Sequence, residues 1–517
     1  MPQMQMPPVR LTDLDGGIDQ PELFFGVVAA VGTPWTTVEP YLRGGLTNRG
    51  YSVDPVIRVS ELLRLFRLKI AYPPDTADEY ERVTTLMDMG DELRRVTGRS
   101  EALALMVAAH INAKRPPGDD RNLPGRAFLI HQLKHPGEVL WLRHIYGDAF
   151  HLIGLYSLPR ARKEYLKRTF GMSDDRAESL ISRDEAEAEP WGQQLRDTFH
   201  LADVFIEMRD DASSTAHAYQ QIERFLDLLF GRKIITPTRH EYAMYLAQAA
   251  ALRSADLSRQ VGAAILDDNG EILALGTNEV PGVGGGQYWG EEGKPDHRDF
   301  KDGFDSNEIK KQESIEEILA RYDPKRWSEY TPGQRKEFIE KLGSTRVGNL
   351  IEFGRAVHAE MEAILSAARR GVSVKGTTLY TTTFPCHNCA KHIVGAGIKR
   401  VIYIEPYPKS LAGELHKDSI GFPGEPPSED QGAATSPMPQ SKVWFEPFVG
   451  VAPRRYSALF SCMSEQGERL KRKVKGGAVS AAPIGLRLRA SVLSHVQREA
   501  LAAVAAQGLQ NPASEEP

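Results

Sequence analysis

The stretch from His358 to Cys389 decides the fold of this chain and the chemistry that it can carry. It reads His358-Ala359-Glu360, then the strand-like run Thr378-Leu379-Tyr380-Thr381-Thr382, then Pro385-Cys386-His387-Asn388-Cys389. The stretch supplies one imidazole and two thiols, which are metal ligands, and one carboxylate that can carry protons. This set of side chains predicts a zinc hydrolase that acts on an amino-substituted heterocycle.

The number of ligands supports a catalytic metal. A catalytic zinc ion typically takes three protein ligands and leaves a fourth, tetrahedral position for water. His358, Cys386 and Cys389 fit that number, and zinc acidifies water enough to make a nucleophile near neutral pH. Glu360 lies two residues beyond the histidine, so it can move a proton from water to leaving ammonia without ligating the metal. We therefore expect one Zn²⁺ per subunit, with Glu360 as the catalytic residue.

Each half of the pattern also has a simpler explanation. A His-x-Glu triplet occurs by chance on amphipathic helices, and Cys-x-x-Cys also forms structural zinc knuckles and redox pairs. In this order, however, H-x-E followed by P-C-x-x-C is the signature of zinc-dependent nucleobase deaminases. A helix predicted from Ala390 to Gly395 would place both cysteines on one face, at an N-terminus that favours thiolates.

Composition sets the broad class of the protein. A chain of 517 residues is too long for one core and suggests two to four domains. The net charge of −5 gives no general attraction to nucleic acid. Two of the three cysteines belong to the motif, and Cys462 stands alone, as in a reducing compartment. Because neither a leader nor a membrane span is evident, we expect a cytoplasmic protein.

The N-terminal part resembles a phosphate-binding domain that has lost a key residue. An apolar, β-rich run from Leu23 ends in Gly32, as a buried parallel strand does before a phosphate loop. Such a loop reads Gly, four residues, Gly-Lys-Ser/Thr, but Thr33 stands where the lysine belongs, and Gly26 lies one residue too far from Gly32. We expect no nucleotide hydrolysis there. Gly26, Gly32 and Thr33 either bind a nucleotide through backbone amides or are architectural.

Alternating patterns predict a parallel α/β domain over residues 20–235. The helical stretches are 59–68, 84–112 and 215–230, and the strand-like stretches are 127–133, 150–156 and 201–206. An acidic run at 184–189 is expected to form a charged helix face or a lid, not a metal site.

The zinc motif lies in a second predicted domain, residues 236–462. A helix at 240–253 is followed by a β-hairpin with an Asn-Gly turn, which ends at Asn278. Asn278 is suited to hold a hydroxylated ligand, although asparagine more often simply forms a turn. A strand at 400–405 leads into a turn with Lys409 and Ser410.

Two further segments are predicted around this domain. An insertion at 283–354 immediately precedes the metal motif, so it is expected to overhang the site or contact another subunit. Strand-like runs at 443–448 and 455–460 close the domain. Residues 463–517 are expected to form a basic tail with one helix at 491–506.

The residues quoted above resemble the zinc-dependent deoxycytidylate deaminases. The resemblance rests on the zinc motif together with Ser258-Arg259-Gln260-Val261-Gly262-Ala263 and Gly276-Thr277-Asn278. The N-terminal α/β part, the insertion and Tyr407-Pro408-Lys409-Ser410 narrow it to the bacterial anti-phage dCTP deaminases. The resemblance covers roughly residues 20 to 460.

This resemblance implies a fold and an activity. The fold would combine a P-loop-like parallel α/β domain with a cytidine-deaminase-like α/β/α domain. The reaction would convert dCTP and dCMP to dUTP and dUMP with release of ammonia, so that dCTP is depleted in antiviral defence.

The resemblance also implies roles for residues and partners. Asn278 would contact the deoxyribose or the base, and Arg259 and Lys409 would contact phosphates, with Ser410 beside them. The protein would be a homo-oligomer, and its N-terminal domain would be controlled by a nucleotide or an inhibitory small RNA.

Two other functions fit parts of the pattern. An editor of polynucleotide cytosine or adenine would need a basic, aromatic-lined channel, which the net charge does not favour. A nucleotide-sensing module with a structural zinc would need a fourth protein ligand, and no third cysteine lies near the motif.

Overall fold

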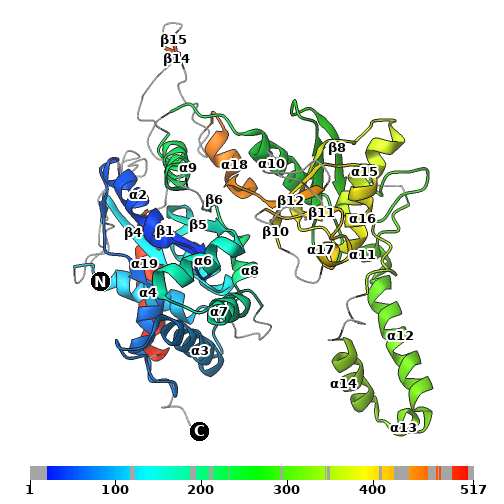
Figure 1. The fold of residues 1–517 in the computed structure, drawn as a ribbon, viewed down its shortest axis with the longest axis horizontal. Coiled ribbons are helices and arrows are strands. Elements are labelled where there is room, and N and C mark those ends of the chain that lie inside the picture. Colours follow the sequence, from blue (N-terminus) through cyan, green and yellow to red (C-terminus); the bar gives the residue numbers. More distant parts are fainter. Residues whose placement is uncertain are drawn as a thin grey trace, which may run out of the picture. The chain divides into compact units, whose positions relative to one another are not determined.

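The computed structural model describes most of the chain. The described residues are 20–116, 123–186, 194–208, 214–231, 233–291, 295–343, 345, 348, 350–406, 410–423, 442–463, 473–474, 477–478 and 492–509. They form two compact units, and the ribbon of each is drawn in Figure 1. The first unit is Met1–Pro237 with Val449–Pro517, and the second is Thr238–Phe448. The second unit is therefore an insertion in the sequence of the first.

The first unit is built on a mostly parallel sheet. Its strand order is β13-β6-β5-β1-β4-β2, with β3 also paired to β4. The strands are β1 (Leu23–Ala29), β2 (Ser52–Val53), β3 (Ile57–Arg58), β4 (Arg126–His131), β5 (Phe150–Ser157), β6 (Val204–Met208) and β13 (Gly450–Val451). Only β13 runs antiparallel to its neighbour among these pairs. The parallel α/β class predicted for this part of the chain is confirmed.

Helices cover both faces of this sheet, so β1 is buried along its whole length. They are α2 (Trp35–Thr47), η1 (Val59–Leu65), α3 (Glu79–Thr97), α4 (Ala102–Asn112), α5 (Pro136–Tyr146), η2 (Gly147–Ala149), α6 (Pro159–Phe170), α7 (Asp174–Ala186), α8 (Leu195–Phe199), α9 (Ser214–Leu229), α18 (Pro453–Phe460) and α19 (Val492–Leu509). Phe25 packs with Leu42 of α2 and Leu226 of α9 in one core. Phe24, on the opposite face, stacks on Tyr146 of α5.

The helical prediction for 84–112 is confirmed except for its continuity, and one strand prediction was wrong. The stretch 84–112 is two helices, because Gly98 adopts a left-handed conformation (φ 63°) that ends α3. Residues 455–460, predicted as a strand, belong to α18, where Pro453 occupies the first turn and starts the helix.

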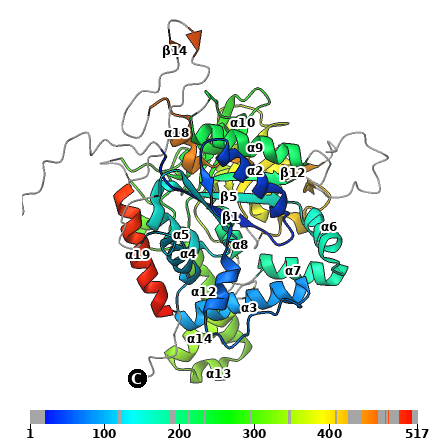
Figure 2. The same cartoon turned by 90° about the vertical axis from the view of Figure 1, so that its left-hand side faces the viewer.

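The C-terminal segment packs within the first unit. Strand β13 pairs with β6, so residues 449–462 lie in the first unit, whereas the sequence predicts a second domain that extends to residue 462. The predicted helix of the tail is present as α19, which lies beside α4 and α5 (Figure 2). It has a buried side, because Glu499 pairs with Arg115 and His495 pairs with Glu22. The basic run of the tail, from Arg469 to Lys475, falls largely outside the described residues.

The second unit contains a six-stranded sheet in the order β11-β12-β10-β9-β7-β8. The strands are β7 (Gly262–Leu266), β8 (Ile272–Thr277), β9 (Thr378–Thr383), β10 (Arg400–Glu405), β11 (Ile420–Gly421) and β12 (Val443–Pro447). Strand β7 is antiparallel to β8 and β9, and the other pairs are parallel. The predicted hairpin is confirmed, and Gly270 takes the left-handed conformation (φ 88°) that its turn needs.

Two glycines let helices approach this sheet closely. The helices of the unit are α10 (Arg239–Ala251), α11 (Asp299–Asp302), α12 (Ser306–Tyr322), α13 (Pro324–Glu329), α14 (Pro332–Gly343), α15 (Ala359–Arg369), α16 (His387–Gly395) and α17 (Ala412–Leu415). A Cβ on Gly276 would lie 2.0 Å from the carbonyl oxygen of Ala359, and one on Gly262 would lie 1.9 Å from that of Ala247. Because Gly276 pairs with Ala263, the two glycines face opposite sides of the hairpin. Helices α15 and α10 therefore lie on opposite faces of the sheet.

The insertion at 283–354 contains α11 to α14. Figure 1 shows α12, α13 and α14 extending away from the sheet of this unit. Arg355 anchors the base of the insertion through ion pairs with Asp299 (2.9 Å) and Asp302 (3.1 Å). Among the described helices of the chain, none combines the length and apolar character needed to cross a membrane.

Candidate metal and nucleotide site

Two helix N-termini bring the predicted metal ligands together. His358 is the N-cap of α15, and Cys386 is the N-cap of α16. Strand β9 ends at Thr383, so the chain leaves the carboxyl end of the sheet just before Cys386. Cys389 lies in the first turn of α16, and its backbone N–H donates to the Cys386 sulfur at 3.5 Å. The predicted helix after the cysteines is thereby confirmed.

The geometry of these three side chains fits a zinc ion. His358 Nδ1 lies 3.3 Å from Cys386 Sγ and 3.4 Å from Cys389 Sγ. Ligands bound tetrahedrally to zinc at the usual Zn–N and Zn–S lengths stand about 3.5 Å apart. In the described part of the chain, this is the one group of three or more His, Cys, Asp or Glu side chains placed to hold a metal ion. The donor set has three members, which leaves a tetrahedral ion one position for another ligand.

Charge within the group also suits a metal cation. Hydrogen bonds from Cys389 and from His358 lower the pKa of Cys386 to about 4, although burial opposes the shift. The hydrogen bond to Cys386 raises the pKa of His358 to about 9. Thiolate is the form of cysteine that binds metal, and imidazole must be neutral to do so. A metal ion that binds here therefore displaces protons.

Glu360 stands beside the metal ligands from the first turn of α15. Its Oε2 lies 3.4 Å from the sulfur of Cys389, and the side chain is 4% exposed. Burial raises the pKa of Glu360, and the negative charge of Cys386 raises it further. A raised pKa makes the carboxylate a stronger base, which suits a group that takes up a proton and then returns it.

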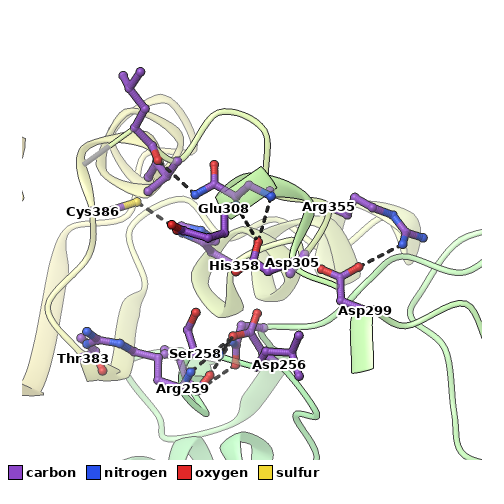
Figure 3. Close-up of a pocket in the computed structure, with 18 of the residues that line it drawn as sticks. Asp256, Ser258, Arg259, Asp299, Asp305, Glu308, Arg355, His358, Thr383 and Cys386 are labelled. Carbon is purple, nitrogen blue, oxygen red and sulfur yellow. Dashed lines mark hydrogen bonds and ion pairs between the residues drawn. The ribbon is translucent and has the colours of Figure 1, made fainter. Parts of the chain in front are cut away.

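These residues lie at a cavity of about 360 Å³ in the second unit (Figure 3). This volume falls within the range of small-molecule sites in proteins. The lining residues that carry polar side chains are Asp256, Ser258, Arg259, Asn278, Asp299, Asp305, Asn307, Glu308, Lys311, Arg355, His358, Glu360, Thr383 and Cys386. Several of them, including Asp305, Asn307, Glu308 and Lys311, come from the insertion, which therefore forms part of the wall.

Asn278 lines the cavity and also holds the backbone of the pocket. Its Oδ1 accepts a hydrogen bond from the N–H of Val261 (2.7 Å), and its Nδ2 donates to the carbonyl of Arg259 (2.8 Å). A primary amide keeps a second N–H and a second lone pair after two such bonds. The turn-forming and ligand-facing interpretations of Asn278 are therefore compatible.

The other predicted substrate contacts differ in their placement. Arg259 lines the cavity, is half-exposed and pairs with Glu405 at 3.1 Å. Ser410 donates from its hydroxyl to the carbonyl of Pro385 (2.7 Å), so it braces the loop before Cys386 and does not line the cavity. Lys409 lies outside the described residues.

Sequence reasoning did not identify the polar residues that the insertion and its base contribute. Arg355 lies three positions before His358, and this short spacing is a signal that could have drawn attention to it. Lys311 lies within a charged amphipathic helix, where no local pattern distinguishes it from its solvated neighbours. Its ammonium group pairs with Glu308 (2.7 Å) and donates to the carbonyl of Gly348 (3.2 Å).

The residues of the first unit that were predicted to bind a nucleotide do not form one group. Gly26 is in the middle of β1, where an added Cβ would meet the Phe150 ring at 2.7 Å, so its role is packing. Gly32 (φ 83°) and Thr33 follow β1 and line a separate cavity. Binding of a nucleotide at this loop stays a prediction.

Comparisons with known proteins agree with the chemistry of the second unit. Residues 237–405 match the family model of the cytidine and deoxycytidylate deaminase zinc-binding region. Deoxycytidylate deaminase of Enterobacteria phage T4 is 31% identical over 176 residues, which are 33% of this chain and 79% of that protein. Probable deoxycytidylate deaminase of Drosophila melanogaster is 30% identical over 185 residues, 35% of this chain and 68% of that protein.

A solved structure is also similar. The dCMP deaminase of cyanophage S-TIM5, crystallised with dCMP and dUMP, shares 19% identity with a TM-score of 0.22. The match covers 41% of this chain and 99% of that one. The matching family model and the His-Cys-Cys group together identify the cofactor of the second unit as Zn²⁺. By its identity to the T4 and Drosophila enzymes over most of their lengths, the chain belongs to the deoxycytidylate deaminase family.

Proposed function

We propose that the second unit converts dCTP and dCMP to dUTP and dUMP, with release of ammonia. The observation that carries this proposal is the position of Glu360, which is buried next to Cys389 at the metal-binding end of a nucleotide-sized cavity. The names of the T4 and Drosophila relatives support deoxycytidylate as a substrate. The extension to dCTP rests on the resemblance to anti-phage dCTP deaminases.

In this proposal His358, Cys386 and Cys389 hold the ion. Bound zinc acts as a Lewis acid that makes water nucleophilic near neutral pH. Glu360 takes a proton at its carboxylate from the attacking water and delivers it to the amino group that leaves C4 of cytosine. Its buried position keeps bulk water from competing for that proton.

We propose that the nucleotide is held mainly from the side of the cavity where Arg259 lies. Figure 3 shows Arg259 apart from Asp305 and Glu308, whose carboxylates would repel phosphates. The carboxylate of Asp256, which lies beside Arg259, accepts hydrogen bonds from the backbone N–H groups of Ser258 and Arg259. Arg259 would exchange its bond to Glu405 for a bond to phosphate, and Lys409 and Ser410 would extend this contact. The remaining N–H and lone pair of Asn278 would bind the deoxyribose or the base.

The decisive experiment measures ammonia and uracil-nucleotide formation by the purified full-length protein. The panel contains dCTP, dCMP, CTP, CMP, deoxycytidine and a cytosine-containing oligonucleotide. We expect turnover of dCTP and dCMP, and its loss in Glu360→Gln. Turnover of the oligonucleotide alone would instead establish a polynucleotide editor. A zinc-loaded protein that turns over none of the panel would contradict the proposal.

We further propose that the enzyme acts in the cytoplasm as a homo-oligomer and depletes dCTP during phage infection. The first unit would control it through a nucleotide or a small inhibitory RNA. The test compares plaque formation on bacteria that express the wild-type protein or Glu360→Gln. Equal plaque numbers for both would contradict the antiviral role while leaving the deaminase activity untouched.

A further inference from the structure

A second cavity, of about 260 Å³, lies in the first unit at the carboxyl ends of β1 and β4. Strands β2, β3 and β4 lie on one side of β1, and β5 and β6 lie on the other. After β4 the chain crosses to the other side of β1 to form β5. The strand order therefore reverses at the boundary between β4 and β1. In open parallel α/β sheets, ligands bind in the crevice at such a reversal, beyond the carboxyl ends of the strands.

The lining of this cavity carries charges of both signs. Arg58 pairs there with Glu61 (3.7 Å) and Arg82 with Glu79 (2.7 Å), whereas the carboxylate partner of the lining residue Lys134 comes from helix α7. The loop that leaves β1, with Gly32 and Thr33, forms another part of the wall. The Thr33 hydroxyl is buried, and it has no hydrogen-bond partner in the described part of the chain. An unsatisfied buried hydroxyl costs free energy, so a bound group that reached it would gain a hydrogen bond.

A carboxylate from α7 reaches the loop after β1. Oδ2 of Asp184 accepts a hydrogen bond from the N–H of Val31 at 2.7 Å. Oδ1 of the same carboxylate pairs with the ammonium group of Lys134 at 2.6 Å. Asp184 is 0% exposed and is not itself a lining residue, but its two partners Val31 and Lys134 both line the cavity. The acidic run to which it belongs was predicted to be a charged helix face or a lid. A backbone N–H and a lysine at this loop are the groups that hold phosphate in nucleotide sites, and here they hold a carboxylate.

Helix α7 is attached to the rest of the first unit through a small apolar cluster and a few polar contacts, so it can move relative to the sheet. It lies next to both α6 and α3 in Figures 1 and 2. Its apolar side packs in a small cluster separate from the main core, with Leu180 and Ile181 against Met87 and Leu166. Ion pairs at the surface complete its attachment, such as that between Arg183 and Asp88 (2.6 Å). Exposed ion pairs contribute little stability, so the buried contacts of Asp184 with Lys134 and Val31 are the main polar attachments of α7. A ligand that takes over these two donors would therefore lower the cost of opening α7.

We propose that this cavity binds a small phosphorylated ligand, and that Asp184 occupies the place of one phosphate while α7 is closed. The N–H of Val31, the Lys134 ammonium group and the Thr33 hydroxyl would then contact the phosphate. Entry of the ligand expels the Asp184 carboxylate, because two anions cannot share these donors. Binding is thereby coupled to an outward movement of α7. This inference rests on the control of the first unit by a nucleotide that is proposed above, and it does not depend on which nucleotide the second unit deaminates.

The test measures binding to the full-length protein by calorimetry. The probes are inorganic tripolyphosphate and ATP, because neither offers a cytosine ring to the second unit. Asp184→Asn keeps an oxygen that can accept from Val31 but removes the competing charge. We expect both probes to bind this variant about tenfold or more tightly than wild type, since the closed state no longer excludes them.

Two further variants make the result specific. Glu178→Gln removes an exposed carboxylate of the same helix and should leave the affinity unchanged, because Glu178 pairs with Lys163 at the surface and does not line the cavity. Adding Lys134→Gln to Asp184→Asn should abolish the gain. Equal affinity of wild type and Asp184→Asn, or binding that persists without Lys134, would overturn the proposal. Binding of ATP but not tripolyphosphate would also overturn it, because the phosphates would not be the recognised part.

Hydrogen exchange of the wild-type protein provides a test that needs no variant. Saturating tripolyphosphate should speed amide exchange in residues 174–186 and slow it in the loop at 30–34. The rest of the first unit serves as the internal reference. Unchanged exchange in both segments would contradict the proposal even if Asp184→Asn failed to fold.

Discussion

The carboxylate of Glu360 and the sulfur of Cys389 lie 3.4 Å apart, although 29 residues separate them in the chain. The contact exists because two helices, α15 and α16, both begin at the carboxyl end of the same sheet. One of them presents a proton carrier at its first turn, and the other presents a metal ligand at its first turn. Neither group needs a loop to position it, so both are held by the rigid part of the unit.

Glu360→Gln should abolish turnover while leaving the metal in place. The amide keeps the size of the side chain but cannot carry a proton, so kcat should fall by about 10²–10⁴-fold. Steady-state kinetics and zinc analysis of the same preparation check this. Glu362→Gln is the matched control, because Glu362 is also buried on α15 but pairs with Arg369. Full activity of Glu360→Gln would exclude the proposed proton transfer.

Cysteine variants test the assignment of the metal ligands. Cys389→Ser replaces a thiolate with a hydroxyl, which is a far weaker zinc ligand, so the zinc content should fall from about one ion per chain to a small fraction. Cys462→Ser should retain the metal, because Cys462 lies outside the His-Cys-Cys group. Elemental analysis of dialysed protein measures both. Full zinc content in Cys389→Ser would show that the ion is held elsewhere.

Arg259→Ala separates recognition of phosphate from recognition of the base. If Arg259 binds phosphate, its loss should weaken binding of dCMP by about 1.5–3 kcal/mol, the value of a hydrogen bond to a charged group. Deoxycytidine, which lacks the phosphate, should be affected much less. The measurement compares kcat/KM for the two substrates in wild type and variant. An equal loss for both would place Arg259 in a structural role beside Glu405.

Asn278→Ala should destabilise the second unit as well as impair the reaction. The substitution removes two hydrogen bonds and leaves the Val261 N–H without its acceptor, at a cost of about 1–3 kcal/mol. Asn307→Ala is a useful comparison, because Asn307 also lines the cavity but its bonds to the backbone at Leu350 and Phe353 are exposed. Asn307→Ala should lower the free energy of unfolding by less than Asn278→Ala does. Denaturant unfolding of both variants gives the difference, and an equal effect would contradict this reasoning.

The buried group of Glu22, Arg115, His495 and Glu499 should make the first unit sensitive to acid. Burial opposes ionisation of Glu22, but hydrogen bonds from His495 and Arg115 lower its pKa below the usual 4.5. A carboxyl group with a lowered native pKa stabilises the fold above its ordinary pKa. That contribution is lost as the pH falls below 4.5 through the native value. Hydrogen exchange in α19 should therefore accelerate over that range before exchange in β1 does.

A variant isolates the same contact at neutral pH. Glu499→Gln leaves Arg115 with one carboxylate in a buried place, and breaking such a pair costs about 3–5 kcal/mol. The unfolding midpoint of the variant, followed by fluorescence, should be lower than that of the wild-type protein. An unchanged midpoint would mean that Arg115 finds water or another partner.

The metal site could be predicted from sequence because its geometry is local. Each half of the motif starts a helix, and one strand lies between them. The hairpin that ends at Asn278 could be predicted for the same reason, because consecutive residues form its turn. The role of Asn278 in bracing Arg259 was not visible, because it depends on how the strand end faces the preceding loop.

Other features depend on contacts between distant residues. No pattern around Glu499 indicates that it pairs with Arg115, which lies 384 positions earlier. Likewise Asp184 looks like one member of an acidic helix face, and only the fold brings it to Val31. The strand predicted at 455–460 is a helix instead, because Pro453 occupies the first turn of α18 and starts it.

The inserted position of the second unit has a consequence for how the protein is made. Strand β13 and helix α19 complete the first unit, yet they are encoded after the second unit. A nascent chain therefore releases all of residues 238–448 from the ribosome before Arg115 can meet Glu499. Domains generally fold as units during synthesis, so the zinc-binding unit can mature first. In each new molecule the zinc-binding unit is fully synthesised before the first unit can close around its own C-terminal segment.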